Sequence, residues 1–86
     1  MEVPVTVRNR AGIHTRPAAT IVKLASKFQS EVFLCNDGFE VNAKSIIGVM
    51  TLTAEQGAIL TLKVEGPDEE IAAKEIGELF ENSFNE

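Results

Sequence analysis

The sequence predicts an α+β fold in which one open antiparallel sheet of four strands is covered on one face by three helices. Four short segments alternate apolar and polar residues, as strands with one buried face do. Three other segments carry apolar residues at helical spacing or follow a residue that commonly caps helices. Along the chain the order is strand, helix, strand, strand, helix, strand, helix (βαββαβα). Helices on one side and water on the other give a two-layer fold.

The first strand and the first helix show two different periodicities. Val3, Val5 and Val7 alternate with more polar residues, which predicts a half-buried strand. A loop is expected over residues 9–15. From residue 17 to about residue 28 apolar residues recur every three or four positions, which predicts a helix of about three turns. The proline that opens this segment suits a first helical turn.

A hairpin is predicted in the middle of the chain. Residues 31–35 and 39–42 are short strand-like segments. Between them lies the sequence Asn-Asp-Gly at residues 36–38, whose members tolerate a positive φ. The two strands are therefore expected to pair directly.

The second half predicts a short helix, a strand and a longer helix. Ser45 is a strong N-cap residue, so a short helix is expected to begin after it. Residues 59–65 alternate as a strand and end at a Gly-Pro pair. Asp68 is expected to cap the last helix, with two glutamates in its first turn. The expected buried stripe of that helix is Ala72, Ile76, Leu79 and Phe80.

Composition narrows the functional classes. A chain of 86 residues predicts one domain, residues 1–86, and a net charge of −5 disfavours nucleic acid and anionic membranes. No apolar run approaches the roughly 20 residues that span a bilayer, no signal-peptide pattern is present, and Cys35 has no second cysteine to pair with. A cytoplasmic location is expected. No metal-ligand spacing or glycine-rich phosphate loop occurs, so neither a metal nor a cofactor is predicted.

The only histidine lies in the segment Gly-Ile-His-Thr-Arg-Pro-Ala-Ala, residues 12–19. His14 is expected at or just before a helix N-terminus, where backbone amides and the positive end of the helix dipole favour an anion. A neutral imidazole has one nitrogen that can attack phosphorus, and the guanidinium of Arg16 can bind phosphate oxygens in pairs. Thr15 is interpreted as an N-cap or a neutral spacer. The alternative is an ordinary surface histidine beside a solvated arginine.

The segment from residue 45 to residue 50 has two interpretations as well. Ser45 caps a helix, which alone explains a serine there, but a serine at a helix start also accepts a phosphate readily. Ile46, Ile47 and Met50 lie in a helix too short to bury every apolar residue. They are expected either to form a partner-docking patch or to close one end of the core.

These two segments together resemble the HPr family, the histidine-containing phosphocarrier proteins of the bacterial phosphoenolpyruvate:sugar phosphotransferase system. The similarity covers essentially the whole chain, and its most specific parts are residues 12–19 and 42–50. It implies the family's open-faced β-sandwich. It also implies a stoichiometric phosphocarrier, not an enzyme.

The resemblance further implies the partners and the residue roles. His14 would accept a phosphoryl group at Nδ1 from phosphorylated Enzyme I and donate it to the EIIA domains of sugar permeases, with Arg16 holding the phosphate. Ser45 matches the serine that an HPr kinase/phosphorylase modifies in many bacteria, which slows acceptance from Enzyme I and promotes binding to a catabolite-control regulator. Ile46, Ile47 and Met50 match the docking helix, and Thr15 is expected to take part in partner docking.

Three other functions remain as alternatives. A nitrogen-related branch of the family keeps the histidine motif and serves a different relay. Regulatory paralogues keep the fold and act as binding modules, but they lose the active histidine, whereas this chain has His14. An unrelated small enzyme with a phosphohistidine intermediate would release phosphate from a small substrate without any partner protein.

Overall fold

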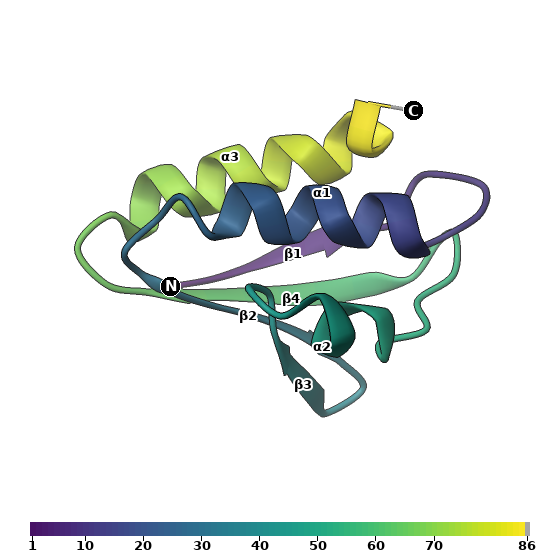
Figure 1. Cartoon of the computed structure of the whole chain (residues 1–86), viewed down its shortest axis with the longest axis horizontal. Helices are drawn as coiled ribbons and strands as arrows, with labels where there is room; N and C mark the ends of the chain where they lie inside the picture. The colour runs from purple at the N-terminus through teal and green to yellow at the C-terminus, as the bar shows by residue number, and fades with distance from the viewer. Residues whose placement is uncertain (86) are drawn as a thin grey trace.

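The computed structural model describes residues 1–85 and contains four strands and three helices, followed by a short 3₁₀ turn (Figure 1). The elements are β1 (Glu2–Thr6), α1 (Thr15–Ala25), β2 (Glu31–Asn36), β3 (Phe39–Asn42), α2 (Ile46–Met50), β4 (Ile59–Glu65), α3 (Glu69–Glu81) and the turn Ser83–Asn85. This order confirms the predicted fold class.

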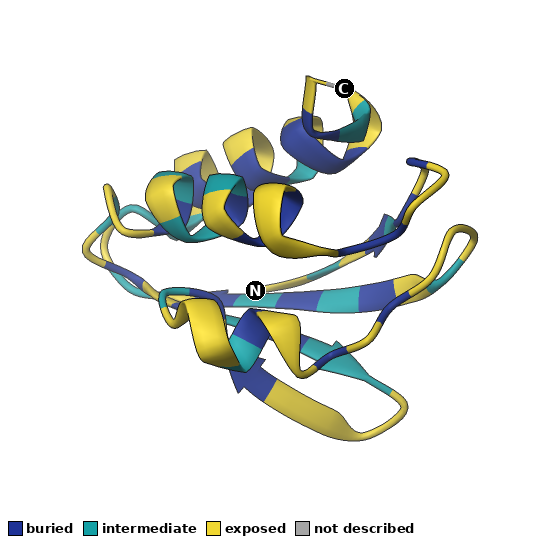
Figure 2. Cartoon of the chain, turned by 45° about the vertical axis from the view of Figure 1, so that its right-hand side comes forward, coloured by how far each residue is buried: buried dark blue, intermediate teal, exposed yellow. Residues whose placement is uncertain are grey.

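The four strands form one antiparallel sheet in the order β1-β4-β2-β3. β4 lies in the middle, where Leu60 pairs with Val5 of β1 and Leu62 pairs with Leu34 of β2. Helices α1 and α3 lie side by side over one face of this sheet (Figure 1). The shorter α2 packs against α1 and β3. The helices and the sheet therefore enclose one apolar core, and Figure 2 colours the buried residues of the chain dark blue.

Alternation along the central strand fixes which face is buried. Leu60, Leu62 and Val64 are buried, while the residues between them are partly exposed. Ile21 of α1 and Phe80 of α3 meet this face from the other side of the layer. Burying a side chain of this size stabilises the fold by about 1.5–3 kcal/mol. The register is therefore determined strongly, because a slip by one residue would turn the leucines outward.

The hairpin between β2 and β3 has the predicted turn. Asp37 and Gly38 both have positive φ, 51° and 82°. Two consecutive residues in this region are typical of a type I′ turn, whose twist matches that of the flanking strands. The Asn-Asp-Gly sequence therefore sets the pairing of Asn36 with Phe39.

The first helix differs from the prediction at both ends. It begins at Thr15, two residues before Pro17, and ends at Ala25 rather than near Phe28. Pro17 is the third helical residue, a position whose N–H would also lack an intrahelical partner, so proline fits there equally well. After Ala25 the chain continues as a turn in which Phe28 N donates to the Ala25 carbonyl. Phe28 therefore packs against the core from this turn and continues the apolar spacing, although the helix ends at Ala25.

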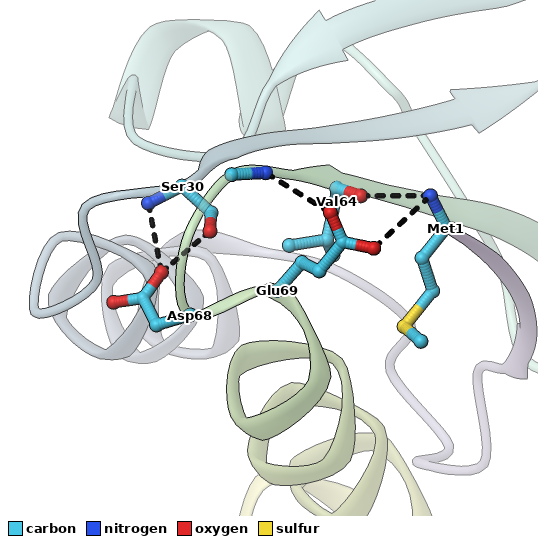
Figure 3. Close-up of polar contacts among 6 residues, drawn as sticks. Met1, Ser30, Val64, Asp68 and Glu69 are labelled. Atoms are coloured by element: carbon cyan, nitrogen blue, oxygen red, sulfur yellow. Dashed lines mark hydrogen bonds and ion pairs between the residues drawn. The ribbon is translucent and has the colours of Figure 1, made fainter.

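The start of α3 corrects a second prediction (Figure 3). Asp68 occupies the N-cap position, but its side chain makes no capping hydrogen bond. Its carboxylate instead accepts from the backbone N–H groups of Gln29 and Ser30, each at 2.9 Å, and from the Ser30 hydroxyl. The Ser30 hydroxyl, followed by the Gln29 amide, holds the pKa of Asp68 below its ordinary value. Asp68 therefore joins α3 to the turn after α1.

Glu69 provides a second link from the same helix start. Its carboxylate accepts from Gly66 N at 3.1 Å and lies 3.9 Å from the Met1 ammonium group. That ammonium group also donates to the Val64 carbonyl at 3.0 Å (Figure 3). The first turn of α3 is thus occupied by its own carboxylates, as the sequence predicted for the two glutamates.

Candidate functional site

His14 is the N-cap residue of α1, and it is exposed. Its backbone is extended (φ −120°, ψ −165°), and its carbonyl accepts the first intrahelical bond from Ala18 N at 2.9 Å. The first turn of the helix contains no acidic residue. The prediction that the imidazole lies at a helix start is confirmed. The site combines a nucleophilic nitrogen with the positive end of a helix dipole.

The loop before His14 is shaped by close backbone contacts. Gly12 has φ +73° and its N–H donates to the Asn9 carbonyl at 3.1 Å, while the Asn9 side-chain amide donates to the Gly12 carbonyl. A Cβ at Gly12 would collide with the carbonyl oxygen of Ala54. Only glycine fits this conformation and this approach. The tight loop leaves Ile13 buried and His14 exposed.

Thr15 and Arg16 are the first two residues of α1, and both are exposed. Thr15 is therefore not the N-cap, which is His14. Arg16 lies in the first turn, where the dipole disfavours a cation. Its carbonyl accepts from the Thr20 hydroxyl at 3.0 Å, an ordinary helix contact that does not involve the guanidinium. A cation at this unfavourable position is consistent with a role in binding an anion beside His14.

The charge of the chain is distributed unevenly around this site. Residues 3–30 contain five basic residues and no Asp or Glu, although the chain as a whole is acidic. Arg16 and Lys23 are seven residues apart and therefore face the same side of α1, and Lys27 follows in the turn beyond it. All three are exposed. This stripe is opposite in sign to α3, which is predominantly acidic.

Ser45 and the neighbouring apolar residues lie in α2, which contacts α1. Ser45 is the N-cap, as predicted, and its hydroxyl accepts from Gly48 N at 3.2 Å. Ile46, Ile47 and Met50 are exposed, Ile47 by 74%. The core below α2 is closed by Val49 instead. The alternative in which the three exposed residues complete the core is therefore wrong.

The described residues, 1–85, contain neither a candidate metal site nor a helix that could span a membrane. No group of three or more His, Cys, Asp or Glu side chains there is arranged to hold a metal ion. Among the helices of the same residues, none is both long and apolar enough to cross a bilayer.

Comparison with known proteins identifies the family. Residues 1–82 match the family described as PTS HPr component phosphorylation site, which places the chain among the phosphocarrier proteins of the phosphotransferase system. The chain belongs to the HPr family. It is 55% identical to the phosphocarrier protein HPr of Treponema pallidum over 82 residues (95% of this chain, 93% of that protein) and 49% identical to that of Xylella fastidiosa over 86 residues (100% and 97%).

Solved structures support the same family. A crystal structure of HPr from Thermoanaerobacter tengcongensis is similar with a TM-score of 0.95 and 45% identity, covering 100% of this chain and 97% of that one. The relatives also include the HPr-like protein Crh of Bacillus subtilis, 46% identical over 72 residues (84% of this chain, 85% of that protein). The relatives of this chain therefore include both proteins described as phosphocarrier protein HPr and a protein described as HPr-like.

The sequence did not reveal what supports the His14 loop from below. Ile13 N donates to the carbonyl of Ala54 at 3.0 Å, and that carbonyl also faces Gly12. Ala54 belongs to the connection between α2 and β4. Nothing local in the sequence marks it as a neighbour of His14, although the conspicuous Gly12 could have indicated a close backbone approach.

Proposed function

We propose that this chain is a stoichiometric phosphocarrier of the cytoplasm, one domain over residues 1–86, that accepts a phosphoryl group on His14 from phosphorylated Enzyme I and donates it to EIIA domains of sugar permeases. The observation that carries the proposal is the exposed His14 at the N-cap of α1, with no carboxylate in the first turn. Membership of the HPr family supports it.

The chemistry requires only a nucleophile and charge stabilisation. A neutral His14 nitrogen attacks phosphorus, the new N–P bond forms as the bond to Enzyme I breaks, and the second transfer repeats the exchange with the EIIA domain as acceptor. The amides at the α1 start and the guanidinium of Arg16 stabilise the phosphate oxygens. Each dipole interaction is worth about 0.3–1 kcal/mol. This is enough to hold the group without preventing its release.

Docking is assigned to two surfaces beside the histidine. The apolar patch of Ile46, Ile47 and Met50 supplies contact area for a partner, and the exposed Thr15 at the start of α1 is proposed to take part in docking. The basic stripe Arg16, Lys23 and Lys27 favours acidic partner surfaces and speeds encounter with them. A combination of apolar contact and charge suits short-lived complexes with two successive partners.

The decisive experiment is incubation of the chain with phosphoenolpyruvate and Enzyme I. One acid-labile, alkali-stable phosphate per chain is expected, and its absence in His14→Ala assigns it to the imidazole. Ser45→Ala serves as the control and should be labelled like the wild type. A wild-type chain that takes up no phosphate would end this proposal. Release of phosphate from a small molecule without Enzyme I would favour an enzyme instead.

A regulatory function through Ser45 is the second candidate, and the similarity to Crh, described as the catabolite repression HPr of Bacillus subtilis, favours it. We propose that an HPr kinase/phosphorylase modifies Ser45 and that the added charge hinders docking of Enzyme I and promotes binding to a catabolite-control regulator. Ser45→Asp should slow phosphate uptake by His14 and strengthen binding to the regulator, measured by calorimetry. If regulator binding persists in His14→Ala while the wild type is never labelled, the chain is a purely regulatory paralogue. Transfer to a nitrogen-branch acceptor but to no sugar EIIA would indicate the other branch.

A further inference from the structure

One residue in the connection between α2 and β4 has an unfavourable backbone conformation. Thr53 has φ +49°, in the left-handed region. A β-branched side chain is rarely found there, because its Cβ crowds the backbone. Residues held in such conformations persist only when the surrounding structure fixes them, and they gather at functional sites. The residues on both sides of Thr53 show what fixes it.

The preceding residue is anchored in the core. Leu52 is 3% exposed, and its N–H donates to the Val49 carbonyl at the end of α2. The Thr53 hydroxyl donates back to the Leu52 carbonyl at 2.7 Å. The chain must therefore change direction at Thr53 itself while Leu52 stays in place.

The following residue supports the functional site. Ala54 is 5% exposed, and its carbonyl oxygen accepts from Ile13 N at 3.0 Å. The same oxygen lies against Gly12, where there is no room for a side chain. Ile13 immediately precedes His14, the N-cap of α1. A shift of the Ala54 carbonyl would therefore move the Ile13 amide and, through one peptide unit, the backbone of His14. Thr53 immediately precedes Ala54 in the chain.

We propose that Thr53 is a positioning residue for phosphoryl acceptance: its left-handed conformation carries the Ala54 carbonyl to the Ile13 amide and so holds His14 at the start of α1. This inference rests on the proposed function of His14. Because α2 ends at Met50, three residues before Thr53, the same connection links the helix capped by Ser45 to the histidine. A displacement of about 1 Å at a reacting group can cost about a hundredfold in rate, so this support matters to transfer.

The proposal predicts an order among substitutions at one position. Glycine and asparagine accept a positive φ, so Thr53→Gly and Thr53→Asn keep the Ala54 carbonyl in place. Thr53→Val keeps the crowded Cβ and loses the hydroxyl bond to Leu52. Thr53→Pro fixes φ near −65° and excludes the observed conformation. The hydrogen bond from Ile13 N to the Ala54 carbonyl should therefore be strongest with glycine or asparagine at position 53, weaker with the native threonine, weaker again with valine and weakest with proline.

Two measurements on the full chain test this order. Hydrogen exchange of the Ile13 amide by NMR should slow about threefold in Thr53→Gly, quicken about threefold in Thr53→Val and lose protection in Thr53→Pro. With phosphorylated Enzyme I as donor, Thr53→Pro should lower kcat about tenfold or more and leave KM within about twofold. Thr53→Asn should retain the wild-type kcat. A merely structural role would lower the melting temperature without this division between kcat and KM.

Thr51→Val is the matched control, because Thr51 is exposed in the same connection but has an ordinary φ of −74°. It should leave Ile13 exchange unchanged. Equal Ile13 protection across the Thr53 series would overturn the inference, and so would an unchanged kcat in Thr53→Val and Thr53→Pro when both are folded. A wild-type chain without phosphate uptake would instead end the proposed function, and the exchange order would still decide whether Thr53 positions the His14 loop.

Discussion

Helices α1 and α3 lie side by side, and each begins with unpaired backbone N–H groups at the positive end of its dipole. The side chains in their first turns nevertheless carry opposite charge. α3 begins with Asp68 at the N-cap and two glutamates in the first turn, so its dipole is complemented by the chain's own carboxylates. α1 begins with His14 at the N-cap, contains no acidic residue in its first turn and places the cation of Arg16 there.

The difference shows how to tell a structural helix start from a functional one. The carboxylates of α3 reach outside the helix, to Ser30, Gly66 and Met1, and they join three parts of the chain. The start of α1 lacks such carboxylates and carries the cation of Arg16 instead. This lowers the stability of the first turn and favours the binding of an external anion. A helix start that lacks acids and holds a nucleophile is therefore a better indicator of function than the helix dipole alone.

Giving α1 the charge of α3 should separate the two roles. Arg16→Glu removes the proposed phosphate ligand and adds a negative charge beside His14, so phosphate uptake should slow at least about tenfold, which corresponds to about 1.4 kcal/mol of barrier. The same substitution suits the helix dipole, so the free energy of unfolding should rise by about 0.3–1 kcal/mol. Transfer kinetics with Enzyme I and urea denaturation measure the two effects.

Opposite signs for rate and stability exclude misfolding as the cause of slow transfer. Ile47→Glu is the control, because it also adds a negative charge but lies in the proposed docking patch of α2. It should raise KM and leave kcat nearly unchanged. Transfer that proceeds at the wild-type rate in Arg16→Glu would remove Arg16 from the mechanism.

Elements determined by local chemistry could be predicted from the sequence. The limits of β3 and β4 agree with the predicted 39–42 and 59–65, because alternation and turn residues define them. Ser45 caps α2 because a serine oxygen and a nearby amide need no distant partner. The start of α1 was misplaced by two residues, since proline is equally compatible with several positions of a first turn.

Contacts between distant segments had no local signal. The carboxylate of Asp68 bonds Ser30, 38 residues away, rather than its own helix. The Ala54 carbonyl that supports Ile13 is likewise set by tertiary packing. The turn Ser83–Asn85 has three successive residues with positive φ and no glycine, and the buried Phe84 packs edge-on against Phe80 at 4.9 Å between ring centroids. In each case tertiary packing, and not the backbone or capping preference of the residue itself, determines the conformation. A local sequence pattern carries no information about such packing.

The smallest predicted effect is a loss of stability at the start of α3, which should leave phosphoryl transfer by His14 unchanged. Because hydrogen bonds lower the pKa of Asp68 in the folded state, its contribution to stability is complete above the ordinary value of 3.8 and is lost as the pH falls through the lowered folded value. Ser30→Ala removes the largest cause of that shift, so acid unfolding should begin at a higher pH. Loss of the buried Ser30 hydroxyl bond should cost about 1 kcal/mol at pH 7. Denaturation from pH 2 to pH 7 measures both effects, and a change in His14 phosphorylation at pH 7 would contradict the separation of the two helix starts.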